Sequence, residues 1–287
     1  MSSTKNDHGN SFVDEIGYSR LIIVETDEVV AAARKRLYSS LSELASKSPA
    51  TLGKAALGFL YPQSLIMKGQ RSAAFTFIDS WKAGRTDDLN LKPINAAEAR
   101  ALQMPPGHPI LRTVYAAHPC VNTRFYPVAS FHLSVFQDKV AEAHRLLSSL
   151  GATDITIEHV HGWDQNFNVN ATGRFNGVDV GAEAGRASTS ASNVHFASTF
   201  NGDIPPSLPE KLHWYQHEQL WQEVAEGRLK RGMRSFSMAI SYHEDHNINA
   251  RLKVKLEKAG LEIGGTFCEH VATTWKMTGT FKDQKPA

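Results

Sequence analysis

The chain has 287 residues, enough for one large domain or two ordinary ones, and its 41% hydrophobic and 21% charged residues exclude a fibrous or wholly disordered protein. The formal net charge is +2, and nucleic-acid binding depends mainly on neutralised phosphates, so no nucleic-acid partner is expected. Two cysteines, Cys120 and Cys268, are too few for a disulfide framework, which favours a reducing compartment.

Both ends of the chain are polar. Residues 1–17 lack the apolar stretch of a signal peptide, and residues 282–287 are short and polar, so both are predicted to be disordered tails. No run of about 18 or more apolar residues is present, so no transmembrane helix is predicted. We therefore expect a cytoplasmic protein, with leaderless export as the alternative.

Residues 18–125 are predicted to form a mixed α/β N-terminal part. The apolar run Leu21–Val24 indicates a buried strand, and Thr26 has the chemistry to cap the helix that follows. Asn95 and Glu98 have the spacing of a capping box at the start of another helix. Further strands are predicted at Ala73–Ile78 and Leu111–Ala117.

Residues 126–281 are predicted to form a C-terminal α+β part with an internal repeat. Residues 130–175 and residues 235–281 show the same expected order of strand, helix and strand. The first expected strand is Ser130–Phe136, and its opening Ser-Phe pair recurs at the start of the expected strand Ser235–Tyr242. We predict an α+β fold in which a mixed N-terminal part precedes two strand–helix–strand units with long antiparallel hairpins.

Helical periodicity indicates three helices in this part. The first is expected from about Asp138 to Leu150, and the last from about Asn247 to Gly260. The middle one ends at Gly232, and its expected buried face consists of Leu220, Trp221, Val224 and Arg228.

Two stretches have the alternation of antiparallel strands. Asn176-Gly177 is the preferred pair for a two-residue hairpin turn, and the register it sets places Arg174 opposite Asp179. From Leu261 to Phe281 the odd positions are mostly apolar and the even positions mostly polar or small. This pattern predicts about two strands with one buried face, bent at a glycine pair.

Catalytic fingerprints are absent from the sequence, so no cofactor is expected. There is no G-x-S-x-G elbow, no P-loop and no dinucleotide-binding glycine motif. The pairs Glu158-His159 and Glu269-His270 follow similar strands of the two predicted repeats. If the repeats were related by pseudo-symmetry, these residues would converge, which makes a soluble enzyme with a His/Glu site the first alternative function.

The spacing of His213 and His217 is that of two metal ligands on one helix face. The zinc-protease motif is not completed, because no second histidine follows Glu218 at the required place. The neighbouring aromatic residues Trp214 and Tyr215 favour packing. A histidine-based metal-binding protein is therefore kept as the second alternative.

A basic cluster, Arg228, Lys230, Arg231 and Arg234, lies at the predicted end of a helix. The ordinary interpretation is that these positive charges complement the helix dipole. The more specific interpretation is that they form a site for anionic lipid. Residues 167–200 alternate and are rich in small side chains, as in the hairpins of β-barrel pore formers, although any half-buried sheet alternates in the same way.

These observations favour a non-enzymatic protein that acts by self-assembly or by binding a partner. Its sharpest version is a membrane-active effector of the β-hairpin pore-forming type. The expected partners are other copies of the chain and an anionic membrane.

Overall fold

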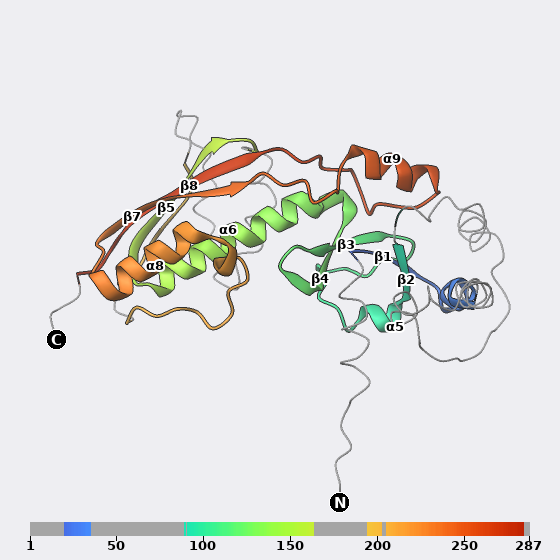
Figure 1. The fold of residues 1–287 in the computed structure, drawn as a ribbon, viewed down its shortest axis with the longest axis horizontal. Helices are drawn as coiled ribbons and strands as arrows, with labels where there is room; N and C mark the ends of the chain where they lie inside the picture. Colours follow the sequence, from blue (N-terminus) through green and yellow to red (C-terminus); the bar gives the residue numbers. More distant parts are fainter. Residues whose placement is uncertain (1–19, 36–88, 90, 164–193, 203–204, 284–287) are drawn as a thin grey trace, which may run out of the picture. The chain divides into compact units, whose positions relative to one another are not determined.

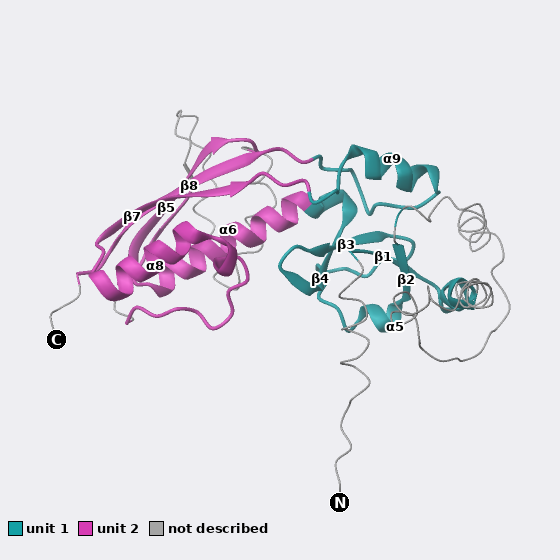
Figure 2. Ribbon diagram, in the orientation of Figure 1, with its two compact units in different colours: residues 1–131, 246–269 teal, residues 132–245, 270–287 magenta. Residues whose placement is uncertain are grey.

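The computed structural model describes residues 20–35, 89, 91–163, 194–202 and 205–283. Helices and two mostly antiparallel four-stranded sheets make up this part of the chain, which confirms the predicted α+β class (Figure 1). The chain divides into two compact units, one of residues 1–131 and 246–269 and one of residues 132–245 and 270–287 (Figure 2). Each unit contains one of the sheets.

The sheet of the first unit has the strand order β2-β1-β3-β4. Strands β1 and β2 are parallel, and the other neighbours are antiparallel. All five residues of β1 are buried, which confirms the strand predicted at Leu21–Val24, and a helix begins after it at Asp27. The strands are β1 (Leu21–Glu25), β2 (Leu91–Asn95), β3 (Val114–His118) and β4 (Val121–Pro127).

Capping side chains set the start of two helices in this unit. The predicted capping box is confirmed at α5 (Ala96–Ala99), where Glu98 N donates to Asn95 Oδ1 at 2.8 Å and Asn95 N donates to Glu98 Oε2 at 3.0 Å. Helix α9 (Ala250–Lys258) is capped by Asn249. It begins later than predicted because Asn247 has a positive φ of 63°, which a helix does not allow.

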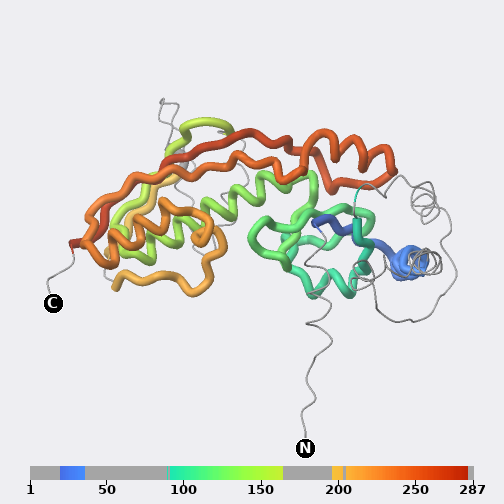
Figure 3. The backbone as a smooth tube through the Cα atoms, viewed as in Figure 1, coloured from blue at the N-terminus to red at the C-terminus, as the bar shows by residue number. Residues whose placement is uncertain are grey.

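The sheet of the second unit is antiparallel throughout, with the order β6-β5-β8-β7. Figure 3 traces β7 in orange and β8 in red, side by side. Two helices, α6 (Phe131–Ser149) and α8 (Gln219–Arg231), lie on the same face of this sheet (Figure 1). The strands are β5 (Ala152–His161), β6 (Val194–Thr199), β7 (Ser235–Tyr242) and β8 (Thr273–Phe281). Short 3-10 turns precede both helices, at Val128–Ser130 and Tyr215–His217.

The core of this unit lies between the sheet and the two helices. Strand β8 buries Trp275, Met277 and Phe281 on one face, which confirms the alternation predicted for these positions. Phe136 of α6 packs edge-on against Trp275, with ring centroids 5.3 Å apart. Helix α8 contributes Trp221, which is fully buried.

The strand predicted at Ser130–Phe136 is wrong, because α6 already begins at Phe131. Phe131 and Val135 are one helical turn apart and both are buried, so the helical period extends to the start of this segment. The first predicted repeat unit therefore opens with a helix. In the second, β7 and β8 come before and after α9 in the sequence, and α9 belongs to the other unit.

Of the two strands predicted between Leu261 and Phe281, one is formed. Leu261 and Ile263 are buried but lie outside any strand, and Glu262 forms an isolated bridge with Thr113. The predicted hairpin at Asn176-Gly177, the strand at Ala73–Ile78 and the tail of residues 1–17 lie outside the described residues.

Candidate functional site

The four candidate catalytic residues are distributed over both units. Glu158 lies on β5 opposite Lys276 of β8, as an opposite-charge pair across two strands. The next residue, His159, is within hydrogen-bonding distance of the carbonyl oxygen of Gly162, 3.1 Å from its Nε2. Glu269 is exposed and belongs to the first unit, whereas His270 belongs to the second.

His270 lies in an aromatic cluster with His132 and Tyr242. The His132 and His270 rings are 5.2 Å apart, and Nδ1 of His132 is 2.8 Å from the Tyr242 hydroxyl. Nε2 of His270 is buried and has no hydrogen-bond partner among the described residues. Burial lowers the pKa of His270, and His243 lowers it further, while Asp245 acts in the opposite direction. His132 is completely buried, so the cluster is chiefly a packing element.

The segment that contains His213 and His217 is held in place by a buried carboxylate. Glu142 of α6 accepts backbone N–H groups from three successive residues, His213 at 2.8 Å, Trp214 at 2.7 Å and Tyr215 at 3.0 Å. His217 ends a 3-10 turn, so the two histidines do not share the face of one α-helix. No group of three metal-ligating side chains occurs in the described part of the chain.

Arg228 is buried, as expected from its place on the predicted helix face, and does not belong to the exposed basic cluster that was also predicted. It is 2% exposed, and its guanidinium carbon lies 4.9 Å from the centre of the Phe281 ring. Its nitrogens donate to the backbone carbonyls of Leu150, Met233 and Lys282. Burial lowers its pKa, and nearby Asp283 partly opposes this effect. The side chain therefore joins backbone ends within the unit and does not reach a ligand in solvent.

The other three basic residues of the expected cluster are exposed. Lys230 and Arg231 both contact Glu226, at 3.4 and 3.3 Å, and Arg234 contacts Asp283 at 3.1 Å. Exposed ion pairs of this kind contribute little to stability. Anionic lipid binding at Lys230, Arg231 and Arg234 stays a prediction.

The membrane-active hypothesis rests mainly on residues 167–200. Residues 167–193 lie outside the described residues, and Val194–Thr199 form β6, which pairs with β5. Among the helices that are described, none is both long and apolar enough to cross a membrane.

The outer edge of β7 is the most distinctive surface of the second unit. Strand β7 pairs with β8 on one side only, and no described strand pairs with its other side. Phe281 N donates to Arg234 O at 2.8 Å, and the register places these residues opposite each other. Hydrogen-bonded pairs alternate along an antiparallel ladder, so Phe236 and Met238 also bond to β8. The backbone groups of Ser235, Ser237, Ala239 and Ser241 consequently point away from the sheet.

One observation checks this alternation independently. The carbonyl oxygen of Ser241 accepts a hydrogen bond from Nζ of Lys139, 2.7 Å away on α6. A carbonyl that pointed toward β8 would be occupied by the ladder. Lys139 thus closes one end of the edge, and the outward groups of Ser235, Ser237 and Ala239 remain along the rest of it.

The β7 edge lacks the features that usually prevent one strand from pairing with another. Natural edge strands are protected by charged side chains, prolines, bulges or very short length. Residues Ser235–Tyr242 include no charged residue and no proline, and their pairing with β8 runs without a register shift. The strand is also eight residues long. It is therefore a suitable template for an added strand.

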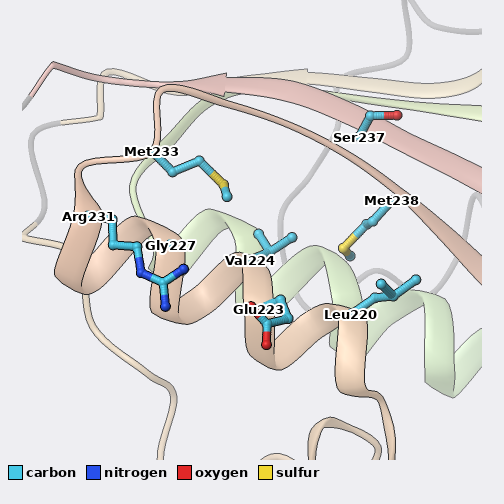
Figure 4. A pocket seen from close by; sticks show the side chains of 8 residues that line it. All are labelled: Leu220, Glu223, Val224, Gly227, Arg231, Met233, Ser237 and Met238. Atoms are coloured by element: carbon cyan, nitrogen blue, oxygen red, sulfur yellow. The ribbon is translucent and has the colours of Figure 1, made fainter.

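An apolar groove runs beside this edge, between α8 and β7. It has a volume of about 390 Å³. Val224 points from the helix toward the strand, while Met233 and Met238 point toward the helix (Figure 4). Leu220, expected on the buried face of the helix, is instead 60% exposed at one end of the groove. The lining residues are Leu220, Glu223, Val224, Gly227, Arg231, Met233, Ser237 and Met238.

Glycine in the middle of α8 shapes the groove. A Cβ atom at Gly227 would lie 2.5 Å from Cε of Met233, so the absence of a side chain lets the thioether lie against the helix. The sequence signal for this site was an uncharged strand directly after a helix. That signal marks an edge only once the strand order is known.

Comparisons with known proteins identify no family for this chain. No protein-family model, no curated protein and no solved structure matches the chain.

Proposed function

We propose that the protein is a non-enzymatic binding protein that recognises another polypeptide by adding a strand to β7. The observation that carries the proposal is the uncharged, unbulged outer edge of Ser235–Tyr242, with outward backbone groups at Ser235, Ser237 and Ala239. An extended segment paired there would gain main-chain hydrogen bonds along the strand, which supply affinity in strand addition.

The groove beside β7 supports the same proposal, because it provides a place for side chains. Alternate residues of an added strand point to the same face of the sheet as Met238, which is the face covered by α8. Apolar side chains at those positions would meet Val224, Met233 and Leu220. Main-chain pairing with a side-chain groove next to it is the arrangement by which strand-addition domains combine affinity with specificity.

The test uses a variant that blocks the edge and keeps the fold. In Ala239→Pro the lost N–H is an outward one, so the ladder to β8 stays intact while the ring obstructs an incoming strand. The matched control is Ala239→Ser, which keeps the N–H. Circular dichroism of both variants checks that each is folded.

A library of random twelve-residue peptides is selected on the wild-type chain, attached sparsely to a surface so that copies do not meet. We expect enriched peptides with apolar residues at alternate positions. Their dissociation constants should rise at least tenfold for Ala239→Pro and stay unchanged for Ala239→Ser. Enriched peptides that bind all three proteins equally, or a selection without enrichment, would show that β7 does not accept strands.

A further inference from the structure

We infer that the strand added to β7 is β7 of a second copy of the chain, in a two-fold dimer with a continuous eight-stranded sheet. This inference rests on the proposed function and names its partner. A two-fold axis is the commonest symmetry of soluble oligomers, and it requires a surface that is complementary to itself.

The outward groups of β7 meet this requirement. In an antiparallel pairing centred on Ser237, each Ser237 faces its counterpart and Ser235 faces Ala239 of the other copy. Every such pair exchanges an N–H and a C=O in both directions. The pairing stops short of Ser241, whose carbonyl is already bonded to Lys139. No charged side chain lies along the strand, so like charges do not face each other between the two paired strands.

The groove favours a second copy over an isolated peptide. Helix α8 and β7 are antiparallel neighbours joined by residues 232–234, so a two-fold axis beside β7 also brings the two α8 helices together beneath the joined sheet. Leu220 is the most exposed large apolar side chain among the described residues, and it stands on α8 at the groove. A lone strand brings no helical layer to cover it, whereas a second copy brings its own Leu220 and Val224.

The size of the contact predicts a weak dimer. The paired segment, the five residues from Ser235 to Ala239, is about 17 Å long, and one sheet and helix layer is on the order of 15 Å deep, so each copy buries about 250 Å². A total near 500 Å² lies well below the range of stable interfaces, about 1,200–2,000 Å². We therefore expect a weak dimer, with a dissociation constant on the order of 100 μM or higher.

Sedimentation equilibrium of the full chain between 1 μM and 1 mM tests the inference. The wild type and Ala239→Ser should show a monomer–dimer equilibrium, and Ala239→Pro should stay monomeric. Leu220→Asp places two carboxylates at the groove of the dimer and should weaken association more than tenfold. Leu229→Asp, on the same helix but outside the groove, is the control with the same added charge and should leave association unchanged.

Amide hydrogen exchange locates the contact on the strand. In the monomer, the amides of Phe236 and Met238 should be protected and those of Ser237 and Ala239 should exchange quickly. At dimer-forming concentration, Ser237 and Ala239 should become protected as well. A dimer that persists in Ala239→Pro would overturn the inference by placing the interface elsewhere.

A monomer up to 1 mM would also overturn this inference. If peptides selected in the first experiment still bind that monomer and lose binding in Ala239→Pro, strand addition stands and its partner is a foreign chain. If neither peptides nor a second copy bind at β7, the proposed function fails as well.

Discussion

Nε of Arg228 donates a hydrogen bond to the carbonyl oxygen of Leu150, 3.1 Å away, where helix α6 has ended. The same guanidinium reaches Met233 O at 3.1 Å, just after α8, and Lys282 O at 2.8 Å, just after β8. One buried cation therefore donates to three carbonyls at the ends of three elements. Arginine suits this place because its donors form a rigid planar fork.

Replacement of Arg228 by methionine should destabilise the second unit strongly. The variant keeps much of the apolar stem but leaves three carbonyls without their donor, so we expect a loss of about 3 kcal/mol in the free energy of unfolding. Urea denaturation followed by tryptophan fluorescence measures it. Lys230→Met, two residues away and exposed, is the control and should change stability little. Equal stability of the two variants would contradict the structural role of Arg228.

Replacement of Glu142 by glutamine should loosen the segment of residues 213–218. The carboxylate accepts three backbone N–H groups, and an amide has only one acceptor oxygen, so at least one N–H loses its partner. We expect a destabilisation of about 1–3 kcal/mol, together with faster hydrogen exchange at Trp214 and Tyr215. Exposed Glu223→Gln is the matched control. Unchanged exchange at Trp214 would show that Glu142 does not hold this segment.

Stability of the second unit should fall as the pH falls below about 6.5, the ordinary pKa of histidine. Burial lowers the pKa of both His144 and His270, so between their folded pKa values and about 6.5 the unfolded chain binds more protons than the folded chain. The contribution of the two histidines to the free energy of unfolding is therefore fully present above about pH 6.5, and it is lost as the pH falls through their folded pKa values.

The measurement is the free energy of unfolding at several pH values between 7.5 and 5.5. His144→Phe and His270→Asn should each reduce its dependence on pH. If both test variants keep the wild-type slope, the pH dependence arises from other groups.

Two glycines should respond very differently to alanine. A Cβ at Gly279 would lie 2.0 Å from the carbonyl oxygen of Asp154 on the neighbouring strand, so Gly279→Ala should cost more than about 2 kcal/mol. At Gly227 the obstacle is the flexible end of Met233, and alanine favours a helix by about 1 kcal/mol. We expect Gly227→Ala to be close to neutral, and stabilising when Met233→Ala is also present. Thermal unfolding of these three variants, with Met233→Ala alone as the reference for the double variant, tests this order.

The strands that were predicted correctly have one-sided burial that is visible in a single short window. Leu21–Val24 and the odd positions of Trp275 to Phe281 are examples, because each strand carries its own pattern of apolar residues. Ser130–Phe136 failed because its apolar residues fit both a strand and a helix over so short a length. The buried residues Val140 and Ala143 continue the helical period beyond this segment, and the whole stretch forms the helix α6.

The candidate site was not predictable from local pattern. Ser235–Tyr242 reads as an ordinary half-buried strand, and only the pairing of β8 with β5 leaves β7 at the edge. Helical periodicity placed Arg228 on the buried face of its helix, whereas its basic neighbours placed it in an exposed cluster, where charged residues usually lie. Its three carbonyl partners come from distant parts of the chain, and no local pattern reports such a convergence.

The order in which the strands of the second unit are synthesised differs from their order in the sheet. Strand β8 is made last and is the one that joins β7 to β5, since β7 has no other described partner. Until Thr273 and the residues after it have emerged, both edges of β7 are unpaired and the four-stranded sheet cannot be completed. A stop codon anywhere before Thr273 would thus remove an internal strand of the sheet and separate β7 from the rest of it.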